Sequence, residues 1–201
     1  MNPPKQLIAC SLRDFPEWHK QRSRYAVWTL VLDQPDLQQQ LEHCQHYLSD
    51  WLHPQQRQLH LTVYVAGFPS HTPRYADCIS WQQLSWQQQA IKQLRLQPLT
   101  LQLTELETFA HAPYIKVANN SQLTAIRQCL AHISPEQRFS EYLPHITLGL
   151  YRRAPSLEQF NRLRQSCPFT PSHWSVRSLY LQSYLATDQL GPLQTHWHYR
   201  F

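Results

Sequence analysis

One pattern occurs twice in this chain: LHLTVYVAG at residues 59–67 and PHITLGLY at residues 144–151. Each copy places a histidine and a threonine two residues apart inside an apolar run, as His60-Leu61-Thr62-Val63 and His145-Ile146-Thr147-Leu148. Side chains two apart on a strand point to the same face of a sheet. Each copy is therefore predicted to be a strand that presents an imidazole beside a hydroxyl and buries its aliphatic side chains on the other face.

The bare pattern has little specificity, because the chain contains 12 histidines. If serine is allowed in place of threonine, His132-Ile133-Ser134 and His173-Trp174-Ser175 match as well. The first runs into Pro135 and is interpreted as a helix terminus. The second lacks the long apolar run that follows the threonine copies. Strand-like flanks and the presence of one copy in each half of the chain set the two threonine motifs apart.

Length and composition indicate a folded globular protein. The chain has 201 residues, of which 42% are hydrophobic and 12% aromatic, enough for one sizeable core or for two small lobes that share one. It contains no apolar run near the roughly 20 residues of a membrane helix. The N-terminal residues lack a basic region followed by an apolar stretch. We expect a soluble, cytoplasmic protein with no membrane partner.

Cysteine spacing and charge limit the function classes. The five cysteines include no Cys-x-x-Cys pair, so we expect free thiols and neither a structural zinc nor any other metal. Only three glycines are present and no glycine-rich phosphate loop occurs, which disfavours a ligase driven by a nucleotide triphosphate. The net charge of +5 mildly favours a polyanionic partner.

Hydrophobic periodicity predicts alternating strands and helices. In the first half we expect a strand at 25–32, a helix at 36–52, the motif strand at 58–66 and a helix at 80–95. In the second half we expect strands at 99–109 and 114–118, a helix at 121–133, the motif strand at 145–151, a helix after Pro155, and closing strands at 174–185 and 195–201. The stretches at 67–75 and 134–144 are interpreted as loops. This order predicts an α+β fold in which strand, helix, motif strand and helix occur twice.

The paired motifs in this setting resemble the 2H phosphoesterase superfamily, and within it the 2′-5′ RNA ligase / RNA 2′,3′-cyclic phosphodiesterase type. The resemblance covers residues 25–201 and is specific at HLTV and HITL. It implies a bilobal α+β fold in which two antiparallel sheets, with flanking helices, form the walls of a central cleft. Residues 1–24 lie outside the resemblance as an N-terminal extension of unknown role, and residues 25–201 are expected to form a single domain.

The resemblance also implies roles for the motif residues. His60 and His145 would carry the chemistry as general acid and base, and Thr62 and Thr147 would hold the phosphoryl oxygens, with no cofactor or metal. Which histidine is the acid is left open. The alternative for each motif is a structural imidazole beside a threonine that favours strands. Two motifs in symmetric places favour the functional interpretation.

Four further side chains are candidates for substrate binding. A basic residue is expected soon after the second motif, but three residues intervene before Arg152 and Arg153, so which arginine contacts the phosphate is left open. Tyr64 shares the predicted face of His60 and would stack on a nucleobase or pack at the rim of the cleft. The same two alternatives apply to Tyr142, three residues before the second motif.

The implied activity is that of a metal-independent phosphodiesterase opening 2′,3′-cyclic phosphates of RNA or small nucleotides, with 2′-5′ RNA ligation as the reverse reaction. The substrate is the only expected partner, and we expect a monomer. Two alternatives remain. The same site would serve a 3′-5′ exonuclease or a 2′,5′-oligonucleotide phosphodiesterase, or the chain is a catalytically silent RNA-binding module. The intact pair of motifs argues against the silent module, because binding does not need two imidazoles.

Overall fold

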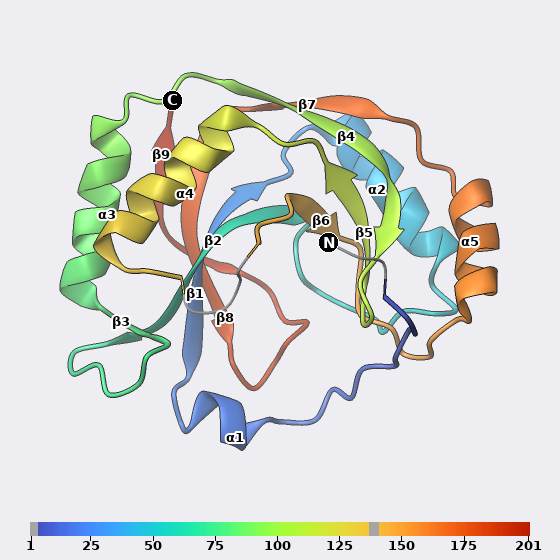
Figure 1. Cartoon of the computed structure of the whole chain (residues 1–201), viewed down its shortest axis with the longest axis horizontal. Coiled ribbons are helices and arrows are strands. Elements are labelled where there is room, and N and C mark those ends of the chain that lie inside the picture. Colours follow the sequence, from blue (N-terminus) through green and yellow to red (C-terminus); the bar gives the residue numbers. More distant parts are fainter. Residues whose placement is uncertain (1–3, 137–140) are drawn as a thin grey trace.

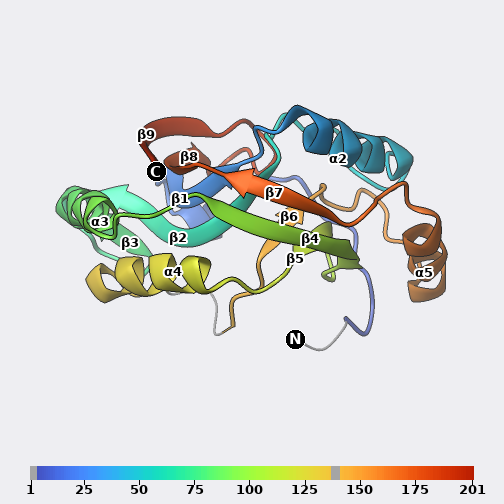
Figure 2. The same cartoon turned by 90° about the horizontal axis from the view of Figure 1, so that it is seen from above.

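The computed structural model describes residues 4–136 and 141–201 (Figures 1 and 2). Its helices are α1 (Pro16–His19), α2 (Pro35–Tyr47), α3 (Trp81–Gln93), α4 (Ser121–Ile133) and α5 (Leu157–Ser166). Its strands are β1 (Arg24–Val31), β2 (His60–Ser70), β3 (Cys78–Ser80), β4 (Leu99–Thr108), β5 (Pro113–Val117), β6 (His145–Thr147), β7 (Ser172–Val176), β8 (Ser178–Leu185) and β9 (Gln194–Arg200). The predicted α+β class is confirmed.

The strands form one sheet in the order β7-β4-β5-β6-β2-β1-β8-β9, with β3 added to β2. All neighbours along this path are antiparallel, and only β3 pairs in parallel. The half β7-β4-β5-β6 joins the half β2-β1-β8-β9 through one paired position, Leu61 opposite Ile146. The two antiparallel sheets expected from the resemblance are the two halves of this curled sheet.

The helices cover the two halves separately (Figure 1). α3 and α4 lie together beside the half that contains β1, β8 and β9, and α2 and α5 lie at the opposite end of the molecule. Ser172 of β7 donates a hydrogen bond to Gln40 of α2, and Arg164 of α5 pairs with Glu107 of β4. One continuous apolar core runs through both halves. The motif strands β2 and β6 are thus held at the centre of the molecule.

The motif strands differ from their predicted lengths. β2 runs on to Ser70, through the stretch interpreted as a loop, because Gly67 adopts a φ of +98° where a Cβ would collide with the Asp77 carbonyl. β6 ends at Thr147 instead of residue 151. The chain leaves the sheet there, and the Leu148 amide donates to the Pro113 carbonyl at 3.0 Å. The apolar run in the sequence extends past the end of the strand because Leu148 is buried although it lies outside β6.

The strand predicted at 174–185 is two strands that belong to different halves of the sheet. β7 pairs with β4, whereas β8 pairs with β1, so the chain crosses between the halves near Arg177. The burial pattern of the side chains in this stretch is consistent with the crossing. Trp174 and Val176 are buried two residues apart, but the next buried side chain is Leu179, three residues on. This shift in the alternation is typical of a break between strands.

The helix predicted at 36–52 is also shorter than expected. α2 ends at Tyr47, and Leu48 and Leu52 are buried in the turn that follows it. The apolar spacing therefore predicted too long a helix.

All five cysteines are free thiols, with Cys44 buried and the others partly exposed. No helix among the described residues is long and apolar enough to cross a membrane.

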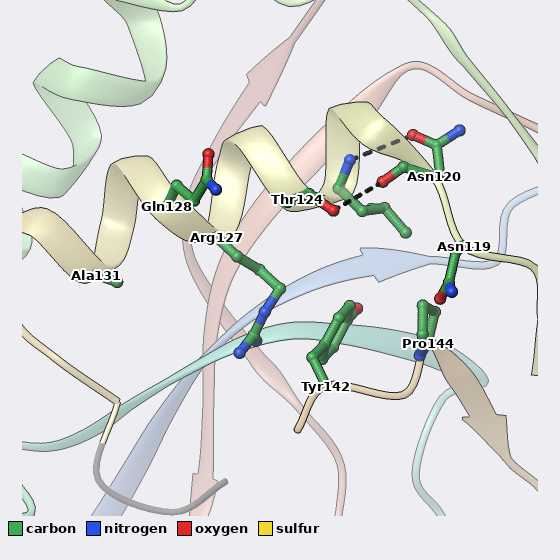
Figure 3. Close-up of a pocket in the computed structure, with 9 residues that line it drawn as sticks. Asn119, Asn120, Thr124, Arg127, Gln128, Ala131, Tyr142 and Pro144 are labelled. Atoms are coloured by element: carbon green, nitrogen blue, oxygen red, sulfur yellow. Dashed lines mark hydrogen bonds between the residues drawn. The ribbon is translucent and has the colours of Figure 1, made fainter. Parts of the chain in front are cut away.

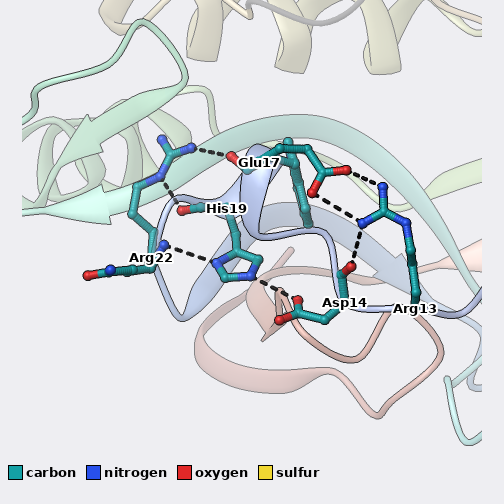
Figure 4. Close-up of polar contacts among 7 residues, drawn as sticks. Arg13, Asp14, Glu17, His19 and Arg22 are labelled. Carbon is teal, nitrogen blue, oxygen red and sulfur yellow. Dashed lines mark hydrogen bonds and ion pairs between the residues drawn. The ribbon is translucent and has the colours of Figure 1, made fainter.

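The described part of the N-terminal segment packs on the rest of the chain. Leu7 is buried, and the amides of Ile8 and Cys10 donate to the carbonyls of Ala110 and Tyr151, both at 2.7 Å. In α1, Trp18 packs against the rings of Tyr25 and Phe68. Polar contacts within the segment, such as His19 with Asp14 and Arg13 with Glu17, fix its path (Figure 4).

A buried polar link joins the sheet to two helices. The Trp28 indole of β1 donates to the side-chain oxygen of Gln87 in α3 at 2.9 Å, and the Gln87 amide donates to the Leu130 carbonyl of α4 at 3.1 Å. Trp28 and Gln87 are both fully buried. A buried polar group is tolerated when its hydrogen bonds are made. Gln87 therefore fixes how α3 and α4 pack on β1.

The substitution Gln87→Leu is expected to lower the free energy of unfolding by about 2 kcal/mol, because it leaves the buried Trp28 indole N–H without a partner and removes the hydrogen bond to Leu130. Urea denaturation measures this change. Gln89→Leu, at an exposed position on the same helix, is the control and should change stability by less than about 0.5 kcal/mol. Equal effects of the two substitutions would contradict a stabilising role for the link.

Candidate active site

The two motifs form one cluster on the face of the sheet opposite Leu61 and Ile146. In an antiparallel pair, residues directly opposite each other point to the same face. With Leu61 opposite Ile146, His60 lies across from Thr147, and Thr62 lies across from His145. Leu61 and Ile146 are fully buried, whereas the four motif side chains are half-buried. Strand pairing therefore places two imidazoles and two hydroxyls in a block, with the histidines on one diagonal.

Both imidazoles are oriented in the same way. Nδ1 of His60 lies 2.7 Å from the Gln58 carbonyl, and Nδ1 of His145 lies 2.7 Å from the Leu143 carbonyl. A carbonyl only accepts, so each neutral ring carries its proton on Nδ1. Within residues 4–136 and 141–201, neither Nε2 has a hydrogen-bond partner. Each ring can therefore accept or donate a proton at Nε2 while Nδ1 holds its orientation.

The environment favours the neutral form of both histidines. Burial lowers the pKa of His60 to about 4, against the opposing hydrogen bond to Gln58, and the charges of Arg57 and His145 lower it further. Burial also lowers the pKa of His145, opposed by the hydrogen bond to Leu143. A bound phosphate anion would raise both values, because a nearby negative charge favours the imidazolium form. Mutual repulsion makes simultaneous protonation of the pair costly.

Aromatic rings pack against His145. The rings of Phe109 and Tyr114 lie 4.9 Å and 5.3 Å from the imidazole, both edge-on, and they stack on each other at 4.2 Å. Tyr114 is also opposite Thr147 in the β5–β6 pair. These contacts restrict the orientation of the imidazole and remove water from one side of it. Neither residue can be identified from the sequence alone, since nothing in the spacing connects them to the motif.

Arg57 is the cation that the structure places close to His60. Its Nε donates to the Gly191 carbonyl at 3.0 Å, and its guanidinium lies 4.1 Å from the centre of the Tyr184 ring. Burial lowers its pKa, and its charge lowers the pKa of His60. The sequence pattern predicts a cation after the second motif, whereas Arg57 lies three residues before the first.

Arg152 and Arg153 lie against the segment that follows α2. Both are exposed. Arg152 donates to the Asp50 carbonyl at 3.3 Å, and the Arg153 guanidinium lies 4.8 Å from the centre of the Trp51 ring. These contacts orient both arginines toward residues 50–51.

Tyr64 is buried beneath α4, with its hydroxyl donating to the Ser134 carbonyl. A shift in the β1–β2 register between Trp28 and Thr29 adds one residue to β2 at Val63, so Tyr64 leaves the face of His60 and Thr62. Burial raises its pKa above the ordinary range. Its ring has no free face for a nucleobase in this arrangement.

Tyr142 supports the motif strands. Its hydroxyl donates to the Thr62 carbonyl at 3.1 Å, and the Arg127 guanidinium lies 3.9 Å from the centre of its ring (Figure 3). Arg127 also donates to the Val63 carbonyl at 2.6 Å and pairs with Glu136 at 2.5 Å, and Glu136 accepts from the Val65 amide. This network satisfies backbone groups of β2 just beyond Thr62, across from the segment that precedes β6.

Among the described residues, no group of three or more histidine, cysteine, aspartate or glutamate side chains is arranged to hold a metal ion. The chemistry available from the cluster itself is proton transfer by two imidazoles. Hydroxyl groups beside them can donate hydrogen bonds to an anionic oxygen.

A curled antiparallel sheet with a His-Thr pair on each of two central strands defines the class of 2H phosphoesterases. The family model for the 2′-5′ RNA ligase superfamily matches residues 33–188. The chain belongs to this superfamily.

Solved structures share the fold at low sequence identity. Escherichia coli LigT in complex with 3′-AMP is 14% identical, with a TM-score of 0.58 over 89% of this chain and 98% of LigT. TT0787 of Thermus thermophilus is 15% identical, with a TM-score of 0.56 over 88% of this chain and 97% of that one. ATU0111 from Agrobacterium tumefaciens is 15% identical, with a TM-score of 0.55 over 97% of this chain and 94% of that one. A search of curated proteins found no match.

The lowered pKa of His60 predicts a loss of stability in acid. The folded protein holds the ring neutral down to about pH 4, while the unfolded chain binds a proton near pH 6.5. The contribution of the neutral His60 ring to the free energy of unfolding is therefore full above pH 6.5. It is lost as the pH falls from 6.5 to 4, with an upper bound of about 3 kcal/mol. Urea denaturation at several pH values measures it.

His60→Asn is the matched variant, because an asparagine amide can replace Nδ1–H as the donor to Gln58 and does not titrate. We expect its stability to fall less steeply between pH 6.5 and 4 than that of the wild type. His132→Asn, at an exposed position at the end of α4, is the control substitution. An unchanged slope in His60→Asn would contradict the lowered pKa.

Proposed function

We propose that the protein is a metal-independent phosphodiesterase that opens 2′,3′-cyclic phosphates of RNA or small nucleotides, with 2′-5′ ligation as the reverse reaction. The observation that carries the proposal is the block of His60, Thr62, His145 and Thr147 formed by the β2–β6 pair. Membership of the 2′-5′ RNA ligase superfamily supports it. LigT, with the same fold, has been crystallised with 3′-AMP and with phosphate.

In the proposed reaction, one imidazole takes a proton from water at its Nε2 as the water oxygen attacks phosphorus. The other imidazole donates a proton from Nε2 to the ribose oxygen that leaves. The P–O bond to that oxygen breaks as the new P–O bond forms, and the product is a phosphomonoester. For ligation, a 5′-hydroxyl takes the place of water along the same path. The diagonal placement of the two histidines suits attack and departure on opposite sides of phosphorus.

The remaining groups stabilise negative charge. Thr62 and Thr147 would donate hydrogen bonds to the non-bridging oxygens, and Arg57 would supply a positive charge beside His60. The half-buried setting strengthens these interactions, because fewer water molecules compete for the phosphate. The Nδ1 hydrogen bonds hold both rings in place, so little reorganisation is needed during proton transfer.

Replacing either histidine by alanine is expected to lower kcat for 2′,3′-cyclic AMP by about 10²–10⁴-fold, since each removes a positioned proton carrier. Turnover is measured with EDTA present, and product analysis identifies the oxygen that leaves. Circular dichroism checks that the fold persists. Unchanged turnover in either variant would overturn the two-histidine mechanism.

Different substrates separate the alternatives. Release of mononucleotides from a 3′-hydroxyl end would favour the exonuclease, and cleavage restricted to 2′,5′ linkages would favour the oligonucleotide phosphodiesterase. RNA affinity without turnover from pH 5 to 9 would favour the silent binding module.

Arg57→Met is expected to lower kcat/KM by about tenfold or more, because it removes a cation whose charge acts on His60 while keeping most of the side-chain volume. Arg152→Met and Arg153→Met are the matched controls, and their kcat/KM should change by less than about twofold. The three variants are compared on 2′,3′-cyclic AMP at low ionic strength. A large loss confined to Arg152 or Arg153 would assign phosphate binding to that residue instead.

A further inference from the structure

A second cavity lies on the other side of the sheet from the motif cluster. It has a volume of about 510 Å³ and is lined by the start of β1, the end of β2, the first turns of α3, and β8 and β9, including Arg24, Trp81, Ser85, Gln88, Ser183 and His196. Arg24 and Ala26 of β1 line it. Val31 is an odd number of residues away from both along the same strand, so its side chain points to the other face of the sheet. Val31 pairs with His60.

The cavity is also distant from the cluster along the strand. Arg24 and Val31 are the first and last residues of β1. At about 3.3 Å per residue, they are separated by roughly 23 Å. A ligand in this cavity would therefore not touch the motif histidines, and the cavity is a separate site.

The cavity is positively charged. Arg24 donates to the Ser183 hydroxyl at 3.3 Å, and no carboxylate among the described residues pairs with it. The Ser183 hydroxyl lies 2.7 Å from Nε2 of His196, which forms a chain of three polar side chains. Arg22, at the edge of the cavity, is neutralised by Asp77. Among the described lining residues there is no acidic side chain, so the charge of Arg24 is available to an anion.

An aromatic ring stands at the same cavity. Trp81 is the first residue of α3, and 48% of its surface is exposed although it is one of the largest apolar side chains. Ser80, which precedes it, caps the helix with a capping box, so the backbone that carries the indole is fixed. The amide of Gln88 and the hydroxyl of Ser85, on the same helix, add hydrogen-bonding groups next to the ring.

We propose that this cavity binds a phosphorylated nucleotide, with the phosphate on Arg24 and the base stacked on Trp81. A guanidinium suits a phosphate because it offers several donors in one plane, and an exposed indole suits a base of any identity. The volume lies within the usual range of small-ligand sites. The same chemistry serves a free nucleotide or one unit of a single-stranded RNA, and the site does not depend on the reaction at the motif cluster.

Binding of 5′-AMP, adenosine, inorganic phosphate and oligo(A) of eight residues, each followed by calorimetry at low salt, tests the proposal. Arg24→Gln and Trp81→Ala should each weaken binding of 5′-AMP by about tenfold or more, and Arg24→Lys should weaken it less. Trp86→Ala and Arg177→Gln are matched controls, because Trp86 is equally exposed on the same helix and Arg177 is an exposed arginine outside the cavity. Both should bind as the wild type does.

Hydrolysis of 2′,3′-cyclic AMP and thermal melting are measured on the same variants. Unchanged turnover and melting temperature in Arg24→Gln would show that the loss of binding is local to the cavity. Absence of turnover in every variant, the wild type included, would count against the proposed phosphodiesterase activity and not against nucleotide binding in the cavity. Tighter binding of oligo(A) than of 5′-AMP, sensitive to both substitutions, would assign the site to RNA, and the reverse order to a free nucleotide. Equal binding of adenosine and 5′-AMP, unchanged affinity in Trp81→Ala, or no binding of any probe would overturn the proposal.

Discussion

The pairing of Leu61 with Ile146 is the contact on which the rest of the structure depends. It is the single paired position between β2 and β6, and it joins the two halves of the sheet. Because both side chains are fully buried, the same contact anchors the core and fixes the register of the motifs. A slip of one residue in either strand would turn the histidine of that strand into the core. Burial of two aliphatic side chains therefore also determines which polar groups meet on the other face.

Because β2 and β6 pair at a single position, polar backbone groups of β2 lack a strand partner there. The structure satisfies them with side chains from elsewhere: the Tyr142 hydroxyl on the Thr62 carbonyl, and the pair of Arg127 and Glu136 on the backbone of Val63 and Val65. Since buried backbone groups must be hydrogen-bonded, these contacts replace strand pairing where β2 extends past the start of β6 at His145. They also tie α4 to the strand that carries the first motif, so the position of the helix and the geometry of the cluster are coupled.

The sheet separates two kinds of surface. On one face, half-buried imidazoles with lowered pKa values suit proton transfer to and from a bound anion. On the other face, at the far end of β1, Arg24 and Trp81 offer a cation and an aromatic ring beside Ser183 and His196. The motif cluster on β2 and β6 and the cavity at Arg24 thus lie on opposite faces of the sheet and differ in chemistry. Alternate side chains of β1 point in opposite directions, which keeps the two surfaces apart.

The sequence by itself determined the α+β class, the order of most helices and strands and the presence of two His-Thr motifs, because alternation and motif spacing are local properties. It gave the wrong ends for β2, β6 and α2, where apolar side chains continue into buried turns and Gly67 permits the strand to go on. Only the tertiary structure decided that β7 and β8 belong to different halves, that Tyr64 is buried, and that Arg57 lies beside His60. Those facts depend on which distant segments pack together, and local spacing carries no information about that.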